Sequence, residues 1–104
     1  MEKIAFKMKL KSGFKEEYKQ RHNAIWPELK ELLKKSGVSD YTIFLDDETD
    51  ILFAVQILDG DQSSQHLGSN AIVQKWWAYM ADIMETNKDL SPVSVPLTRI
   101  FHLD

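Results

Sequence analysis

Residues 16–29 read EEYKQRHNAIWPEL, and this stretch decides how the first half of the chain folds. Tyr18 and His22 stand four positions apart, so their side chains share one face if the segment is helical. Pro27 disfavours helical geometry at Trp26 and removes a backbone donor. The stretch therefore predicts one helix that ends between His22 and Trp26, and a second helix that begins near Pro27.

The position of His22 near the end of a helix bears on its charge. The carboxyl end of a helix favours a cation, so the sequence predicts a protonated imidazole, the form that a general acid needs near neutral pH. A histidine on such a face can equally be a packed core residue or a surface residue. Its pairing with Tyr18 makes a shared role in a binding site a hypothesis.

Periodic patterns on either side complete the first half of the chain. Apolar residues alternate with lysine or alanine over residues 3–10, which predicts a strand with one buried face. Residues 12–13, Ser-Gly, break this pattern before the first helix. Leucines at 29, 32 and 33 form the apolar stripe of the second helix, which residues 36–37, again Ser-Gly, are expected to end.

The middle of the chain predicts a hairpin. Residues 41–45 and 51–58 are rich in β-branched and aromatic side chains, which favour strands. The acidic linker 46–50 between them is short enough to join the two strands as an antiparallel pair.

The last third predicts two helices and one more strand. Asp61 could cap a short helix, and Asn70 could cap a longer one that runs to about Met84. Residues 86–96 contain two prolines and few apolar side chains, so we expect a loop that leads into a final strand near residues 97–103.

The order β-α-β-β-α-β over a single domain, residues 1–104, matches a ferredoxin-like α+β fold. This fold is a four-stranded antiparallel sheet with helices on one face. The two hairpin strands carry apolar residues on both faces, which is more than a one-sided sheet requires. In so short a chain the expected cover is another copy, so we predict a homodimer that packs through the sheets.

The amino-acid composition limits the kinds of partner that the protein is expected to bind. Of 104 residues, 43% are hydrophobic and 28% are charged, as in ordinary globular proteins. The formal charge of −3 and the mixing of lysines with carboxylates argue against nucleic acid and anionic membranes, and favour a neutral or cationic small molecule. The N-terminus lacks the apolar run of a signal peptide, and no segment reaches membrane-spanning length, so we expect a cytosolic protein.

Three aromatic residues join Tyr18 as candidate ligand contacts. Trp76 and Trp77 belong to helical stripes about 100° apart, so one core-facing surface cannot easily hold both indoles. One of them is therefore a candidate to line a cavity, where an indole suits the C–H face and hydroxyls of a sugar; both could instead be core or dimer contacts. Tyr41 shares a strand face with Ile43, and it joins the same pocket only if that face meets the first helix.

A metal site is not expected. His66 and His102 have no spacing that would bring them together with His22 as ligands, and most carboxylates stand in turns or in helical ion pairs. Without cysteine there is neither a disulfide nor a thiolate nucleophile or ligand. The sequence also lacks a glycine-rich phosphate loop and the motifs of serine hydrolases and zinc proteases.

With these residues in view, the chain resembles the L-rhamnose mutarotase family over nearly its full length. The resemblance rests on separated motifs: EYKQRHNAIWPEL at 17–29, YTIFLD at 41–46, WWAYMADIM at 76–84 and SPV at 91–93. It implies a dimeric ferredoxin-like α/β barrel that needs no cofactor. It also implies that His22 is the proton donor and that the substrate is bound by four residues, Tyr18, Tyr41, Trp76 and Trp77.

The implied reaction interconverts the α and β anomers of L-rhamnose. Its general acid would be His22, whereas the base is open between a tyrosine hydroxyl, an ordered water and His22 relaying in both directions. Two other functions are compatible with a small fold of this kind. One is a cofactor-independent monooxygenase, and the other is a haem-binding or ligand-binding module with His22 or His66 as an axial ligand.

Overall fold

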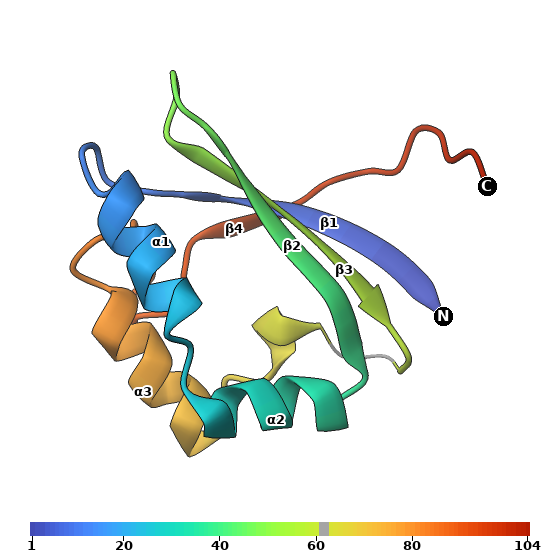
Figure 1. Cartoon of the computed structure of the whole chain (residues 1–104), viewed down its shortest axis with the longest axis horizontal. Helices are drawn as coiled ribbons and strands as arrows, with labels where there is room; N and C mark the ends of the chain where they lie inside the picture. Colours follow the sequence, from blue (N-terminus) through green and yellow to red (C-terminus); the bar gives the residue numbers. More distant parts are fainter. Residues whose placement is uncertain (61–62) are drawn as a thin grey trace.

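The computed structural model describes residues 1–60 and 63–104 and contains a sheet with helices packed on one side (Figure 1). The elements in chain order are β1 (Glu2–Lys9), α1 (Lys15–Asn23), α2 (Pro27–Lys35), β2 (Val38–Asp46), β3 (Ile51–Leu58), the 3-10 helix η1 (Ser64–His66), α3 (Ala71–Met80) and β4 (Ser94–Pro96).

The sheet has the strand order β2-β3-β1-β4, and every neighbouring pair is antiparallel. The helices α1, α2 and α3 lie on the same side of it, and no helix formed by the described residues covers the opposite face (Figure 1). The predicted α+β fold with a four-stranded antiparallel sheet and helices on one face is therefore confirmed.

The break between α1 and α2 falls where the proline places it. Helix α1 ends at Asn23, and the Ala24 N–H closes its last turn on the Gln20 carbonyl at 3.1 Å. Trp26 is extended, with φ −62° and ψ 131°, as expected for a residue before proline, and Pro27 is the first residue of α2. The bend turns α2 back under the sheet and leaves His22 in the last turn of α1.

The core lies between the sheet and α3. Inward-facing residues alternate along β1 and β3 as the period of two predicts. Buried members of this core are Phe6, Met8, Leu10, Leu52, Ala54, Val73, Trp76, Trp77, Met80 and Ile83.

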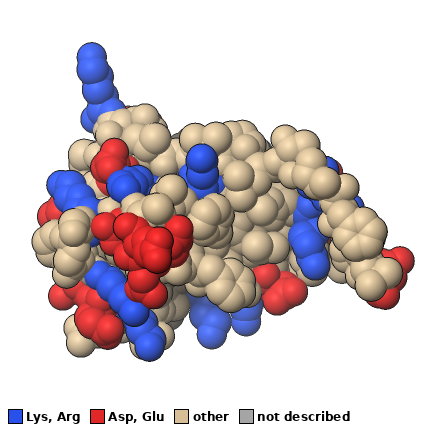
Figure 2. Space-filling view, turned by 90° about the horizontal axis from the view of Figure 1, so that it is seen from above, with Lys and Arg blue, Asp and Glu red and all other residues tan. Residues whose placement is uncertain are grey.

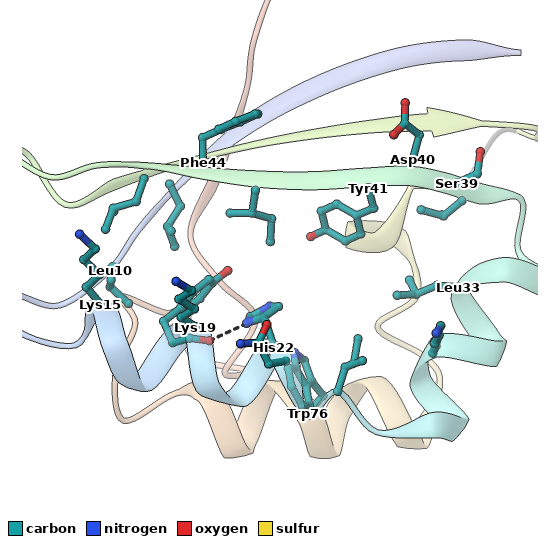
Figure 3. Close-up of a pocket in the computed structure, with 18 of the residues that line it drawn as sticks. Leu10, Lys15, Lys19, His22, Leu33, Ser39, Asp40, Tyr41, Phe44 and Trp76 are labelled. Carbon is teal, nitrogen blue, oxygen red and sulfur yellow. Dashed lines mark hydrogen bonds between the residues drawn. The ribbon is translucent and has the colours of Figure 1, made fainter.

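Strand β2 contains a bulge that decides which way its side chains point. Its pairing with β3 shifts between Ser39 and Thr42, so Asp40 and Tyr41 together oppose the single residue Gln56. Asp40 has a φ of 46°, a left-handed conformation that aspartate tolerates better than most residues. The extra residue leaves Asp40 on the outer face and turns Tyr41 toward the helices (Figure 3).

The second half of the chain differs in part from its predicted structure. The prediction that α3 runs to about Met84 is wrong, because the helix ends at Met80. Beyond it the backbone joins β1 instead: the Lys11 N–H donates to the Ile83 carbonyl at 2.9 Å, and Leu10 forms a bridge with Met84. The cap at Asn70 is confirmed by a 3.1 Å hydrogen bond from the Ile72 N–H, whereas Asp61 lies outside the described residues.

The predicted position of the last strand is also wrong. Strand β4 is Ser94–Pro96, inside the segment expected to be a loop, and it pairs with Phe6–Met8 of β1. Pro96 lacks a backbone donor, which an edge strand tolerates. After Leu97 donates to Ala5 at 2.9 Å the chain leaves the sheet, and strand-forming side chains alone do not make a strand without a partner backbone.

Candidate active site

A cavity of about 650 Å³ opens between the sheet and the helices, within the usual size range of small-molecule sites (Figure 3). Its wall draws on α1, α2, β2, β3 and α3. Four of the residues singled out from the sequence line it, namely Tyr18, His22, Tyr41 and Trp76. Residues far apart in the chain thus meet at one place.

His22 is fixed on both sides by its neighbours. Its ring stacks on Tyr18 with 4.2 Å between ring centroids, and it meets the Trp76 ring at 88° and 5.5 Å. Its Nδ1 lies 3.0 Å from the Tyr18 carbonyl oxygen. Because a carbonyl only accepts, Nδ1 carries a proton, and the lone pair of the neutral ring is on Nε2.

The charge of His22 differs from the prediction made from the helix end. Burial lowers the pKa of His22 from its ordinary value of 6.5, and the hydrogen bond to the Tyr18 carbonyl offsets this only in part. The ring is therefore neutral near pH 7. The short helix α1 provides too weak a field to outweigh the cost of placing a cation among aromatic rings.

The two tyrosines reach the cavity from opposite walls. Tyr18 comes from α1 and is buried, and burial raises its pKa. Tyr41 comes from β2 past the bulge and is partly buried; burial raises its pKa, while hydrogen bonding to Ser64 and Gln56 acts in the opposite direction. Both phenols keep their protons at neutral pH, so they can donate hydrogen bonds to a ligand.

The structure places the two tryptophans in different surroundings. Trp76 forms part of the cavity wall beside His22. Trp77 does not line this cavity: its ring packs over Gly68, where a Cβ atom would lie 2.8 Å from the indole. It borders a smaller cavity of about 60 Å³, which His22 and Trp76 also touch.

Trp26 and Arg21 pack against residues of the site, a role that the sequence analysis did not predict. Trp26 packs edge-on against Trp76 at 5.1 Å and stacks on Tyr79 at 5.5 Å. The Arg21 guanidinium lies over the Tyr79 ring, 4.5 Å from its centroid, and donates hydrogen bonds to the Asp82 carboxylate at 2.9 and 3.2 Å. Arg21 thereby fastens α1, which carries His22, to the end of α3.

Sequence reasoning also missed a polar pair beside Tyr41. Gln56 is fully buried on β3, and it exchanges hydrogen bonds with Ser64 of η1. The signal was a glutamine on the buried face of a strand that is otherwise apolar there.

The other histidines lie away from the cavity. His66 accepts a 3.1 Å hydrogen bond from the Ser63 N–H as part of the cap of η1, and His102 pairs with Asp104 at 2.9 Å. Within residues 1–60 and 63–104, no three histidine or carboxylate side chains gather as metal ligands. None of the helices in this part of the chain has the length and apolar character to cross a bilayer.

The fold and the cavity define a small α+β protein with a candidate small-molecule site, whose wall includes an imidazole, two phenols and an indole. A family model described as L-rhamnose mutarotase matches residues 3–103. The chain belongs to the L-rhamnose mutarotase family, which confirms the resemblance inferred from its motifs.

Individual relatives agree with this assignment. L-rhamnose mutarotases of Bacteroides thetaiotaomicron and Phocaeicola vulgatus are 62% and 60% identical over 104 residues, covering the whole of each chain. The crystal structure of L-rhamnose mutarotase from Formosa agariphila superimposes with a TM-score of 0.93 at 55% identity, again over the whole of both chains. These relatives support neither the monooxygenase nor the haem-binding alternative.

Proposed function

We propose that this protein interconverts the α and β anomers of L-rhamnose, with His22 as the acid–base group. The observation that carries the assignment of His22 is its geometry. One ring nitrogen is tied to a carbonyl, the other is an available base, and the ring borders a cavity walled by phenol and indole groups. The family membership of the chain supports the reaction and the substrate.

The reaction demands only proton transfer. Ring opening removes the proton of the anomeric hydroxyl, forms the C1 carbonyl and breaks the bond from C1 to the ring oxygen, which takes up a proton. The aldehyde turns about the C1–C2 bond, and the same steps in reverse close the ring on its other face. Because one proton leaves and one returns, a single group that accepts and gives back a proton suffices, without metal or redox cofactor.

A neutral His22 fits this cycle. Its Nε2 takes the proton of the anomeric hydroxyl, and the imidazolium keeps its Nδ1–H on the Tyr18 carbonyl, which stabilises the new charge. The imidazolium then protonates the ring oxygen. Of the three sources of a base that the sequence left open, we therefore favour His22 relaying in both directions.

The aromatic side chains bind the sugar. The hydroxyls of Tyr18 and Tyr41 orient sugar hydroxyls, and the Trp76 ring covers apolar C–H groups while keeping water from the open-chain intermediate. For Trp77 we infer a supporting role in place of the contact implied by the resemblance, because its ring packs against Gly68.

Saturation-transfer NMR on L-rhamnose measures anomer exchange at equilibrium and tests this assignment. We expect His22→Ala to lower the catalysed rate by about 10²- to 10⁴-fold, since the acid–base group is lost. His102→Ala is the matched control, because that imidazole is not part of the wall of this cavity and pairs with Asp104 at the end of the chain. A His22→Ala protein that exchanges anomers as fast as the unaltered one would refute the role of His22.

We further infer that two copies pack through the helix-free faces of their sheets as a dimeric α/β barrel. On this face the side chains of Phe44 on β2 and Val95 on β4 are 61% and 46% exposed, and Phe53, Val55 and Ile57 of β3 are partly exposed beside Phe44. Lys7 of β1 interrupts this apolar surface, because it pairs with Phe53 on one side and with Val95 on the other. Figure 2 shows basic groups among the uncharged ones on this face. Such a surface is typical of an interface. A cytosolic location stays a prediction from the sequence.

Sedimentation analysis tests the dimer. The unaltered protein is expected to sediment as a dimer, and Phe44→Glu to shift it toward monomer by placing a charge in the apolar face. Gln20→Glu adds the same charge on the exposed side of α1 and serves as control. A monomer at all concentrations of the unaltered protein would exclude the interface.

A further inference from the structure

A polar pair interrupts the apolar interior directly beside the cavity. Gln56 is fully buried, whereas the other buried residues on its face of β3 are Leu52, Ala54 and Leu58. Burying a glutamine among aliphatic side chains is unfavourable unless its amide is fully hydrogen-bonded. The buried position of Gln56 therefore indicates that its amide has a specific hydrogen-bonding role.

The amide is engaged on both of its ends by Ser64. Its nitrogen donates to the Ser64 hydroxyl, and its oxygen accepts from the Ser64 N–H at 3.3 Å. This exchange pins η1 to the buried face of β3. Gln65 also donates to the Ser64 hydroxyl, at 3.3 Å, so the oxygen of Ser64 receives two N–H groups and its own proton must point elsewhere.

The bulge in β2 brings Tyr41 to this pair. Asp40 and Tyr41 together stand opposite Gln56, and the added residue turns the Tyr41 ring into the cavity (Figure 3). Tyr41 therefore shares the helix-facing side of the sheet with Gln56, and the polar groups of Ser64 and Gln56 lower the pKa of Tyr41 against the effect of burial. A Ser64 hydroxyl that donates its proton to the Tyr41 oxygen would leave the Tyr41 proton free for a ligand.

We propose that Gln56 and Ser64 are positioning residues, which hold the Tyr41 hydroxyl with its proton directed at a hydroxyl group of the bound sugar. The inference rests on the proposed function. It goes further by assigning part of the sugar recognition to a glutamine outside the wall of the main cavity. Because Tyr41 stands on the wall opposite His22, its hydroxyl acts on binding more than on the proton relay.

A double-mutant cycle tests this coupling. Gln56→Met and Ser64→Ala each remove the hydrogen bonds with little change of volume, and each is expected to raise the KM for L-rhamnose about 3- to 10-fold with a smaller change in kcat. In a Tyr41→Phe background, where there is no hydroxyl to position, the same changes are expected to alter KM by less than about 2-fold.

The control variant separates positioning from loss of structure. Ser63→Ala removes the cap of η1, since the Ser63 hydroxyl accepts from the Gln65 N–H at 3.2 Å, but it leaves the Gln56–Ser64 pair in place. It is expected to lower the melting temperature and leave KM unchanged. If Gln56→Met does not fold, Ser64→Ala completes the same cycle.

The possible failures are distinguishable. Equal effects of Gln56→Met or Ser64→Ala with and without the Tyr41 hydroxyl, or no effect on KM at all, would overturn the positioning role while the unaltered protein still exchanges anomers. Absence of exchange by the unaltered protein would overturn the proposed function and this inference with it.

Discussion

Trp76 and Trp77 are neighbours in the chain, and each is 8% exposed, yet they belong to two different environments. On the side of Trp76, the rings of His22, Tyr18 and Trp26 meet edge to face or stacked and leave a cavity open. On the side of Trp77, the indole lies directly on Gly68, with no space for even one methyl group between them.

The difference teaches that burial does not separate a binding residue from a packing residue. Equal exposure reflects the wall of a cavity of about 650 Å³ in one case, and close packing beside a cavity of only about 60 Å³ in the other. A ring that binds a ligand has free space beside it, whereas a ring that only packs is surrounded by protein atoms. The two sides of α3 should therefore respond differently to the same change.

The largest effect is expected from truncating each indole in turn. Trp77→Ala should lower the free energy of unfolding by about 3–5 kcal/mol, because it leaves a void in a packed core. Trp76→Ala should destabilise less, because its ring already borders open space, but should raise the KM for L-rhamnose about 3- to 10-fold. Urea unfolding and NMR exchange measure the two quantities. Similar losses of unfolding free energy and similar rises in KM in both variants would contradict the different roles of Trp76 and Trp77.

A smaller effect is expected from adding one methyl group on the packed side. Gly68→Ala places a Cβ atom 2.8 Å from the Trp77 ring, and overpacking of this kind costs about 1–3 kcal/mol. Gly60→Ala is the matched control, because the nearest atom to its added Cβ would be the Ser36 carbonyl oxygen at an ordinary 3.7 Å. An unchanged melting temperature for Gly68→Ala would show that the packed side is looser than the structure indicates.

The smallest effect is expected from a change of pH, which acts on the cavity through the protonation of His22. The pKa of His22 is lowered in the folded protein from its ordinary 6.5, so the unfolded chain binds more protons below that pH. Stability is thus expected to be constant above about pH 6.5 and to fall as the pH drops toward the folded pKa. The exchange rate should fall at the acidic end of this window, where the pH reaches the lowered pKa of the folded protein and His22 becomes protonated.

His22→Gln provides the comparison for the pH experiment, because it cannot titrate. Its melting temperature should depend less on pH between about pH 7 and pH 5 than that of the unaltered protein. A rate that rises as the solution is made more acidic would instead favour the protonated ring that the helix end alone predicts.

Much of the fold was predictable because its signals are local. The helix break at Pro27, the alternation in β1, the hairpin and the cap at Asn70 each depend on a few adjacent residues. The end of α3 and the position of β4 were not predictable in the same way. Both depend on where β1 offers free backbone groups, and the sequence of the later segment does not contain that information.

The site was predictable as a set of residues and less so as an arrangement. The spacing of Tyr18 and His22 indicated their shared face, and a stacked pair is found there. The bulge at Asp40 and the Gln56–Ser64 pair could not be foreseen, because each involves a contact between strands or between a strand and a remote turn.

The sequence by itself determined the order of elements, the bend before α2 and the shared face of Tyr18 and His22, because periods of two and 3.6 residues and the geometry of proline act over short distances. Only the tertiary structure decided that His22 is neutral, that Trp76 lines the cavity while Trp77 packs, and that Tyr41 points inward. These properties depend on desolvation and on neighbours brought from distant parts of the chain, and no local pattern specifies either of them.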